Sequence, residues 1–171
     1  MTLLPCIGCG AMFPASDGAV HRYMESSPGC WAAFGEVLAR EYSDAAYALA
    51  HRLTVDSYAV QHPGRPSPQS LQSVSLHLIS LCLMLEHHVS MQHATEVLQE
   101  SGKDKSGFVW LDPPLMRGEV TIANVKTAEN AKQHVELVWA WAKSAWTAWS
   151  GHHNTIEACL QKLDHPPRRA V

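Results

Sequence analysis

Apolar residues recur at helical spacing along most of the chain. Between residues 30 and 42 they return every three or four positions, which places them on one face of a helix. Similar spacing and polar capping residues extend this reading to other segments. The expected helices cover about 30–42, 45–61, 68–88, 90–99, 122–125, 127–149 and 150–163. The pattern therefore predicts an all-α fold, a helical bundle.

Four tryptophans mark the helix that Thr127 is expected to cap. Trp139 and Trp146 share one face of this helix, and Trp141 and Trp149 lie roughly on another. Because large side chains on two faces need burial on both, this helix is expected to be central and heavily buried.

The first 29 residues lack helical periodicity and are rich in glycine and proline, so they are expected to form a loop-rich cap. The bundle would then occupy residues 30–165. With 171 residues, the chain has the length of one domain, 1–171, with a hydrophobic core of its own.

The cap contains a Cys-x-x-Cys-Gly knuckle at Cys6 and Cys9, a spacing that lets two thiolates bind one metal ion. His21 and Cys30 are the next available ligands, and together the four residues predict a structural zinc site of the Cys₃His type. A redox pair would favour a strand–helix–strand context, which the pattern does not indicate. Unligated thiols are the remaining alternative.

Composition and charge limit the classes of partner and the cellular compartment that we expect. The net charge of −3, with histidine neutral, offers no electrostatic footprint for nucleic acid or a membrane surface. The sequence has no apolar run of transmembrane length and no secretory signal pattern at its start. Together with an odd number of cysteines, five, this favours the reducing cytoplasm.

Eleven histidines are the main indication of chemistry. In the stretch from His51 to Gly64, two histidines lie among apolar residues, but they are about 16 Å apart along a helix axis and cannot share one metal ion. Inward side chains from different helices of a bundle can converge. We therefore consider one set of candidates for catalysis or for a second metal site. The set is His51 or His62, His77 and His153, supported by Asp56, Tyr58 and Glu157.

A structural role for the same residues is an equal alternative. His77 has Ser73 and Ser80 near it on the helix surface, and a buried histidine is commonly hydrogen-bonded within the core. Arg52 and Asp56 stand four residues apart and can form a simple ion pair. Tyr58 and Gln61 can serve only to hold loops.

Several phrases resemble a bacterial family of unknown function, over nearly the whole chain. They are the Cys6–Gly10 knuckle, His21-Arg22-Tyr23, Ser27–Trp31, Gly35–Tyr42, His51–Gly64, His77-Leu78 and His152-His153. Gly151 departs from the resemblance, which would place proline there, so the helix start at that point would be looser. The resemblance implies membership of a family and no activity.

Two functions of different classes follow. The first is a metal-dependent or histidine-based enzyme, of hydrolase or transferase type, with a polar pocket between helices. The second is a zinc-containing binding module for a small molecule or a protein, without chemistry. A second metal, or a histidine with a perturbed pKa in a solvent-reachable cleft, would favour the enzyme. A single zinc with dry, fully hydrogen-bonded inner histidines would favour the binding module.

Overall fold

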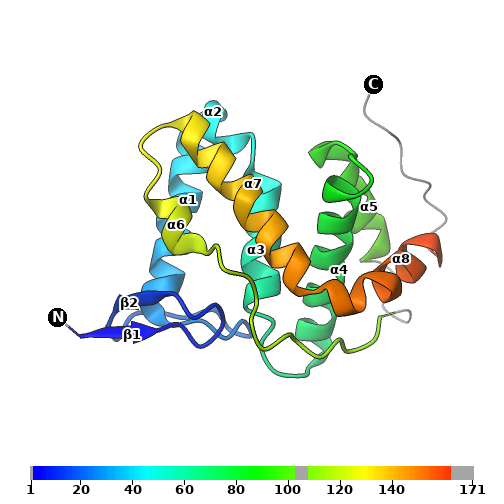
Figure 1. The fold of residues 1–171 in the computed structure, drawn as a ribbon, viewed down its shortest axis with the longest axis horizontal. Helices are drawn as coiled ribbons and strands as arrows, with labels where there is room; N and C mark the ends of the chain where they lie inside the picture. Colours follow the sequence, from blue (N-terminus) through cyan, green and yellow to red (C-terminus); the bar gives the residue numbers. More distant parts are fainter. Residues whose placement is uncertain (1, 103–107, 163–171) are drawn as a thin grey trace.

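The computed structural model describes residues 2–102 and 108–162 and confirms a mainly helical fold (Figure 1). Its elements, in chain order, are β1 (Leu3–Pro5), β2 (Met12–Pro14), α1 (Pro28–Ser43), α2 (Ala45–Ala48), α3 (His51–Gln61), α4 (Pro68–Leu85), α5 (Met91–Ser101), α6 (Ile122–Lys126), α7 (Ala131–Ala148), the 3-10 turn η1 (Ser150–His152) and α8 (His153–Lys162). The last residue of the final predicted helix, the end of the predicted bundle at 163–165 and most of the connection after Gly102 lie outside the described residues.

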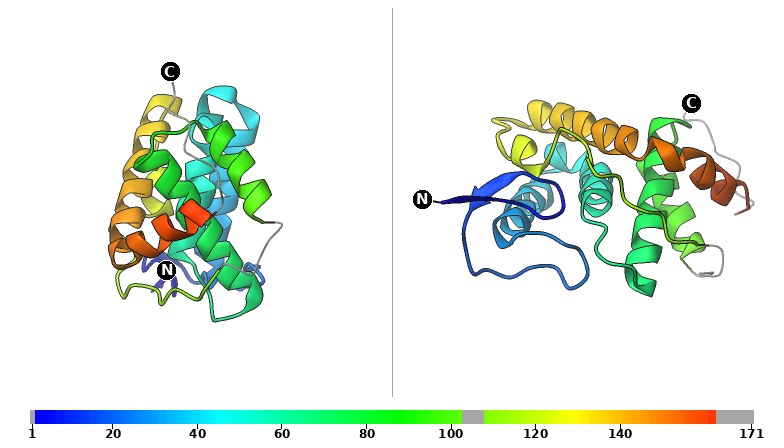
Figure 2. Two further views of the ribbon diagram at one scale, coloured as in Figure 1. Left: turned by 90° about the vertical axis from the view of Figure 1, so that its right-hand side faces the viewer. Right: turned by 60° about the horizontal axis from the view of Figure 1, so that its bottom comes forward.

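Helix α3 is at the centre of the arrangement. It packs mainly against α4 and α7, while α1 and α6 pack together on one side and α5 and α8 pack against α4 on the other (Figures 1 and 2). Most of α3 is buried, including its polar residues Thr54, Asp56 and Gln61. A helix buried in this way must satisfy its polar side chains inside the protein.

Side-chain caps explain where several helices begin. Ser27 accepts a hydrogen bond from the Cys30 amide at the start of α1, and Ser67 accepts one from the Ser70 amide at the start of α4. In both helices proline follows the cap, where its missing N–H has no intrahelical partner to lose. These starts can be read from the sequence, as the predicted ranges show.

Two helix boundaries differ from the prediction. The expected helix 45–61 is two helices, because the chain turns at Leu49 and Ala50, and α2 then packs on α7 while α3 packs on α4. The last long helix is capped by Asn130, whose side chain accepts from the Gln133 amide, and not by Thr127. The Thr127 hydroxyl instead donates to the Asn124 carbonyl at the end of α6.

The helix that carries the tryptophans is central, but one of the four tryptophans is less buried than predicted. Trp141 and Trp149 are fully buried and Trp146 is nearly so, but Trp139 is 37% exposed. The indole N–H groups of the buried tryptophans bind Gln61, Val60 and Glu86, so each polar atom has a partner.

The N-terminal cap contains a short hairpin that the sequence pattern did not predict. Strands β1 and β2 pair antiparallel, with Leu4 opposite Phe13, and the Cys-x-x-Cys knuckle forms the turn between them. Phe13 is buried and rests against the backbone of Gly29 in the first turn of α1. The hairpin thus holds the knuckle against the start of the bundle.

None of the helices in the described part of the chain is long and apolar enough to cross a membrane.

Candidate metal centre and polar clusters

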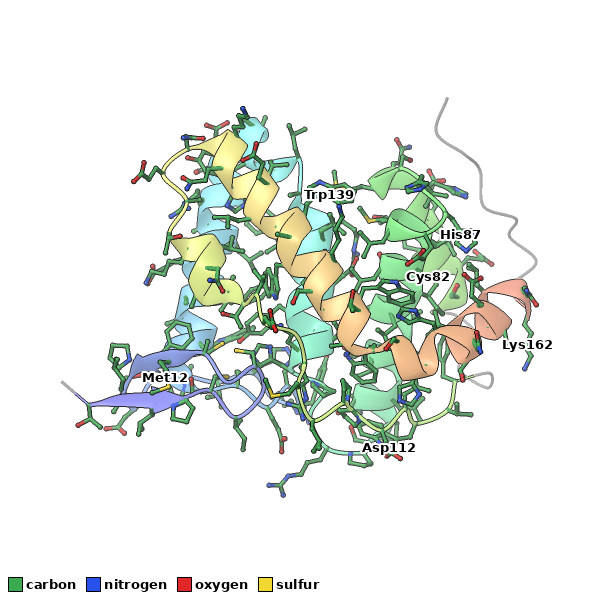
Figure 3. The ribbon with its side chains drawn as sticks, in the orientation of Figure 1. Met12, Cys82, His87, Asp112, Trp139 and Lys162 are labelled. Atoms are coloured by element: carbon green, nitrogen blue, oxygen red, sulfur yellow. The ribbon has the colours of Figure 1, made fainter. Side chains whose placement is uncertain are left out.

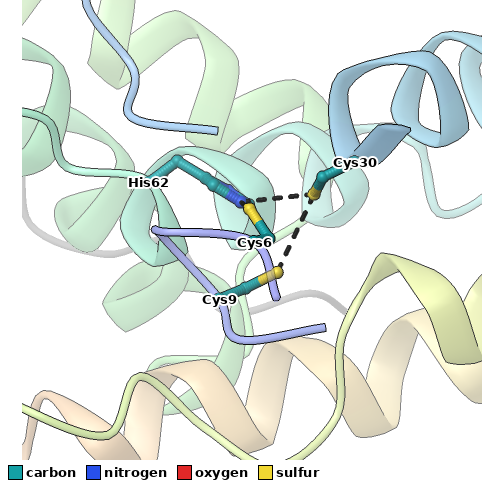
Figure 4. A group of neighbouring side chains, drawn as sticks. All are labelled: Cys6, Cys9, Cys30 and His62. Carbon is teal, nitrogen blue, oxygen red and sulfur yellow. Dashed lines mark hydrogen bonds between the residues drawn. The ribbon is translucent and has the colours of Figure 1, made fainter. Parts of the chain in front are cut away.

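Four potential metal ligands meet where the cap joins the bundle. The sulfurs of Cys6, Cys9 and Cys30 and a ring nitrogen of His62 all lie within 4.8 Å of one another (Figure 4). Three of the four residues are buried, and Cys9 is partly buried. The cluster can hold one metal ion with four protein ligands.

The spacing of these atoms fits a tetrahedral ion. Nε2 of His62 is 3.4 Å from both Cys6 Sγ and Cys30 Sγ, and Cys9 Sγ is 3.8 Å from Cys30 Sγ. Around an ion with bonds of about 2.3 Å to sulfur and about 2.0 Å to nitrogen, a tetrahedron separates two sulfurs by about 3.8 Å and sulfur from nitrogen by about 3.5 Å. The observed distances agree with these values to within a few tenths of an ångström.

The backbone of the knuckle and the end of α3 aim the four ligands. Cys6 and Cys9 lie in the hairpin turn, Cys30 is in the first turn of α1, and His62 is the residue at which α3 ends. The Nδ1 atom of His62 lies 2.7 Å from the Tyr58 carbonyl, which can only accept, so Nδ1 carries the proton. In the neutral ring this leaves the Nε2 lone pair for a metal ion, as in many histidine metal sites.

Tyr58 also fixes the plane of the His62 ring. Its own ring stacks between Phe34 and His62, with ring centroids 3.9 and 4.0 Å apart. The buried Tyr58 hydroxyl donates to Cys30 Sγ at 3.7 Å. Burial, and then the Cys30 charge, raise the pKa of Tyr58, so it remains a neutral donor. The structure therefore places this predicted catalytic residue in support of the metal centre.

The fourth member of the cluster is His62 and not His21, the residue that the sequence predicted. Nδ1 of His21 accepts contacts from the amides of Tyr23 and Met24, and its ring lies against Trp31. The sequence pattern instead groups His62 with the histidines of the bundle. Its position directly before Pro63-Gly64, at a helix end, was the available sign that it could face the cap.

The thiols of the cluster shift one another's pKa values in opposite directions. Hydrogen bonds from Cys30 and then Cys9 hold the pKa of Cys6 well below its usual range. The same contacts, with burial, raise the pKa of Cys30 well above its usual range. A divalent cation would remove this conflict by balancing the charge of the deprotonated sulfurs.

Arg117 binds the backbone of the Cys-x-x-Cys knuckle, a contact that the sequence pattern does not predict. Its Nη1 donates to the Gly8 carbonyl at 2.7 Å. Gln61 positions this segment by donating to the carbonyls of Arg117 and Val120, and Trp141 donates to Gln61 in turn. The predicted loop-holding role of Gln61 is confirmed. No motif marks Arg117, because its contact spans 109 residues.

Gly8 gives the first test of this geometry. A Cβ at this position would lie 2.5 Å from the Glu25 carbonyl oxygen and closer still to Cδ2 of His62. We expect Gly8→Ala to displace His62, weaken metal retention at least tenfold in a chelator competition assay, and lower the melting temperature. Gly35→Ala is the matched control, because a Cβ there meets nothing within 4 Å and alanine favours the helix by about 0.5–1 kcal/mol. Equal metal retention in both variants would contradict the geometry.

A second polar cluster surrounds Asp56 on the opposite flank of α3. The fully buried Asp56 carboxylate accepts from Arg52 through a bidentate contact, from His77 Nδ1 at 2.7 Å, and from the Ser80 hydroxyl at 2.5 Å. The predicted Arg52–Asp56 ion pair is confirmed, although its carboxylate is buried and not solvated. His77 and Ser80 are in α4, so the cluster ties α4 to α3.

His77 also lines a groove. The groove has a volume of about 300 Å³ and is bordered by Tyr23, Gln69, Gln72, Ser73, Leu76 and His77. Nδ1 of His77 donates to Asp56, so it cannot also accept from Arg52 Nη2, which lies 3.2 Å away. Within the described residues Nε2 has no hydrogen bond, so it is left for the groove. The Asp56–His77 pair has the geometry of a histidine oriented by a buried carboxylate.

The stability of the protein should depend on pH because of Asp56. Burial opposes its charge, but hydrogen bonding to His77 and the charges of His77 and Arg52 outweigh this and lower its pKa below 3.8. The stability it contributes is therefore present above the unfolded-state pKa of about 3.9 and is lost as the pH falls through the lower folded-state pKa. We expect urea unfolding between pH 7 and pH 3 to show a steeper loss of stability in the wild type than in Asp56→Asn. Equal slopes would contradict this.

His51 belongs to a third cluster, around the buried Glu41 of α1. Glu41 accepts from His51 Nδ1 at 2.7 Å, His134 Nε2 at 2.9 Å and the Thr54 hydroxyl at 2.5 Å. His134 is fully buried and its Nδ1 has no hydrogen-bond partner among the described residues. This cluster joins α1, α3 and α7, with Glu41 and His134 fully buried and the His51 side chain 32% exposed.

His153 lies apart from the other candidates. Its ring stacks on Trp146 with centroids 3.7 Å apart, and Nε2 contacts the Trp146 carbonyl. Glu157, expected to support His153, instead contacts Cys82 and His87. The structure thus distributes His51, His62, His77 and His153 over four separate environments and does not bring them together in one polar centre.

Comparison with known proteins identifies a family for the chain and no individual relative. Residues 4–150 match the model described as a family of unknown function, DUF5946, which confirms the resemblance noted in the sequence. Comparison with curated proteins and with solved structures found no match. The matched residues include all four ligands of the candidate metal centre.

Proposed function

The chain belongs to DUF5946, a family of unknown function, and we propose from its site geometry that it is a zinc-stabilised helical protein. In this proposal Cys6, Cys9, Cys30 and His62 bind one structural zinc ion. The observation that supports it is the convergence of three sulfurs and one nitrogen at tetrahedral spacing. Four protein ligands leave no open position, which is the property of a structural zinc site.

Zinc is favoured over other ions by the ligand set. Thiolate and imidazole ligands in a tetrahedron suit Zn²⁺, whereas Mg²⁺ and Ca²⁺ require oxygen ligands. X-ray absorption at the zinc edge should give three sulfurs and one nitrogen in the first shell. A spectrum with two metal ions close together, or with mainly oxygen ligands, would contradict the assignment.

We further propose that the protein is a histidine-based enzyme of hydrolase or transferase type. In this proposal the groove beside His77 is its active site and binds a small polar molecule. The buried Asp56 would hold the His77 ring in place, and Nε2 would exchange a proton with the bound molecule. Zinc takes no part in this step. Neither nucleic acid nor a membrane surface is expected as partner, and the five free cysteines favour the cytoplasm.

A binding module without chemistry is the second candidate, and one observation favours it. No nucleophilic side chain among the described residues is hydrogen-bonded to His77, since its described contacts are with Asp56 and Arg52 only. The groove would then hold a small molecule or a protein segment through hydrogen bonds with Gln69, Gln72 and His77.

Acylation of histidines by diethyl pyrocarbonate separates a reactive His77 from one that is only part of the core. The reagent acylates a neutral imidazole nitrogen, so peptide-resolved mass spectrometry should find His77 modified, while the fully buried His134 is protected. Asp56→Asn removes the carboxylate that holds the ring, so it should change the rate of His77 modification. Protection of His77 equal to that of His134 would contradict a working site at this groove.

A further inference from the structure

A second group of metal-ligating side chains lies at the other end of the molecule. Cys82 is in α4, His87 follows the end of α4, and Glu157 is in α8. One ligand atom from each lies within 4.8 Å of the others. Figure 3 shows Cys82 and His87 close together beside α8, far from the hairpin that holds the first centre.

Within this group an oxygen, a nitrogen and a sulfur ligand atom lie close together. Oε1 of Glu157 is 2.9 Å from His87 Nε2 and 3.2 Å from Cys82 Sγ. Tetrahedral coordination would separate these pairs by about 3.4 and about 3.6 Å, given usual bond lengths to nitrogen, oxygen and sulfur. A shift of a few tenths of an ångström in the Glu157 side chain would therefore admit an ion.

The backbone at the end of α4 holds His87 in place relative to Cys82. The Cys82 carbonyl accepts from the amides of both Glu86 and His87, at 2.9 and 3.2 Å. The next residue, His88, has φ of 53°, and no other non-glycine residue in the described part of the chain has positive φ. This left-handed turn ends the helix and positions the His87 backbone one turn beyond Cys82.

Charge and exposure indicate the kind of ion and its coordination. A thiolate and a carboxylate together balance one divalent cation, and the imidazole adds a neutral ligand. The Glu86 carboxylate, bound by the Trp146 indole at 2.6 Å, adds negative charge near Cys82. The side chains of His87 and Glu157 are 28% and 37% exposed, whereas Cys82 is buried. One side of the group therefore faces solvent.

We propose that Cys82, His87 and Glu157 form a second metal site, for Zn²⁺ or a similar borderline divalent ion, with its fourth position open to solvent. The mixed sulfur, nitrogen and oxygen ligands exclude Mg²⁺ and Ca²⁺ as preferred ions. Three protein ligands and an open position distinguish it from the closed Cys₃His centre and leave room for water or a small ligand. When occupied, the site also ties α8 to α4.

The test is a titration of the zinc-loaded protein with Co²⁺, because cobalt bound to thiolate has an intense near-ultraviolet absorption. We expect this absorption to saturate at one cobalt per chain, with no release of zinc. Cys82→Ser should abolish the absorption, and His87→Ala should weaken cobalt binding at least tenfold. Cys159→Ser is the matched control, since Cys159 lies in α8 outside the group, and it should bind like the wild type.

Three outcomes would overturn the proposal. They are an absence of thiolate absorption, absorption unchanged in Cys82→Ser, and absorption that appears only as zinc leaves the first centre. If Cys82→Ser fails to fold, Glu157→Gln gives the same test at a partly exposed side chain, and unchanged cobalt affinity would then overturn the site. Cys82→Ser leaves all four Cys₃His ligands unchanged, so loss of the absorption in this variant assigns the cobalt to the second group whether or not the first centre holds zinc.

Discussion

Replacing Cys6 and Cys9 together by serine should remove the metal ion and lower the free energy of unfolding by several kcal/mol. The reason is that binding of a structural zinc ion contributes on the order of 10 kcal/mol to folding in small zinc-dependent domains. Here the ion would join three segments that are distant in sequence, the hairpin, the start of α1 and the end of α3. Loss of two ligands would release the hairpin and leave the buried His62 without its partners.

Thermal and urea unfolding of the serine double variant measure this effect, with zinc determined on the same samples. Cys159→Ser controls for the loss of a thiol, because Cys159 is only partly buried and lies in α8, away from the metal centre. We expect the control to unfold within about 1 kcal/mol of the wild type. Unchanged unfolding of the double variant would refute a stabilising metal centre.

Asp56→Ala should be the other strongly destabilising change, by about 3–5 kcal/mol. Asp56 is fully buried and holds Arg52, His77 and Ser80, so its removal leaves a guanidinium without its counter-charge inside the protein. Breaking a buried pair from one side costs more than the pair contributes, because the remaining charge is uncompensated.

The matched control for Asp56→Ala is Glu136→Ala. Lys132 and Glu136 are also four residues apart on a helix, but both side chains are exposed and their charged atoms are 4.0 Å apart. We expect Glu136→Ala to change the free energy of urea unfolding by less than about 0.5 kcal/mol. Similar effects of the two substitutions would show that the Asp56 cluster does not stabilise the α3–α4 contact.

Local signals in the sequence account for most of the helices. Apolar spacing located most of the helices, and Ser27-Pro28 and Ser67-Pro68 are starts that depend on adjacent residues only. The turn at Leu49 and Ala50 has no such signal, since neither glycine nor proline marks it and the break serves the packing of α2 on α7. Tertiary contacts decided that boundary.

The candidate sites show the same division between local and distant information. Cys6, Cys9 and Cys30 could be recognised from spacing, because the knuckle is a local motif. His62 could not be chosen over His21 from spacing, since it reaches the cysteines only when α3 packs beside α1. The partners of Glu157 were missed for the same reason, because they come from α4 and the turn that follows it, at least 70 residues earlier.

The most direct test of the account is the zinc content of untagged protein, by elemental mass spectrometry, for the wild type, His62→Ala and His21→Ala after dialysis against a mild chelator. We expect one retained zinc per chain in the wild type and in His21→Ala, and its loss in His62→Ala. A wild type without zinc, or zinc that survives in His62→Ala and is lost in His21→Ala, would contradict the Cys₃His centre at Cys6, Cys9, Cys30 and His62.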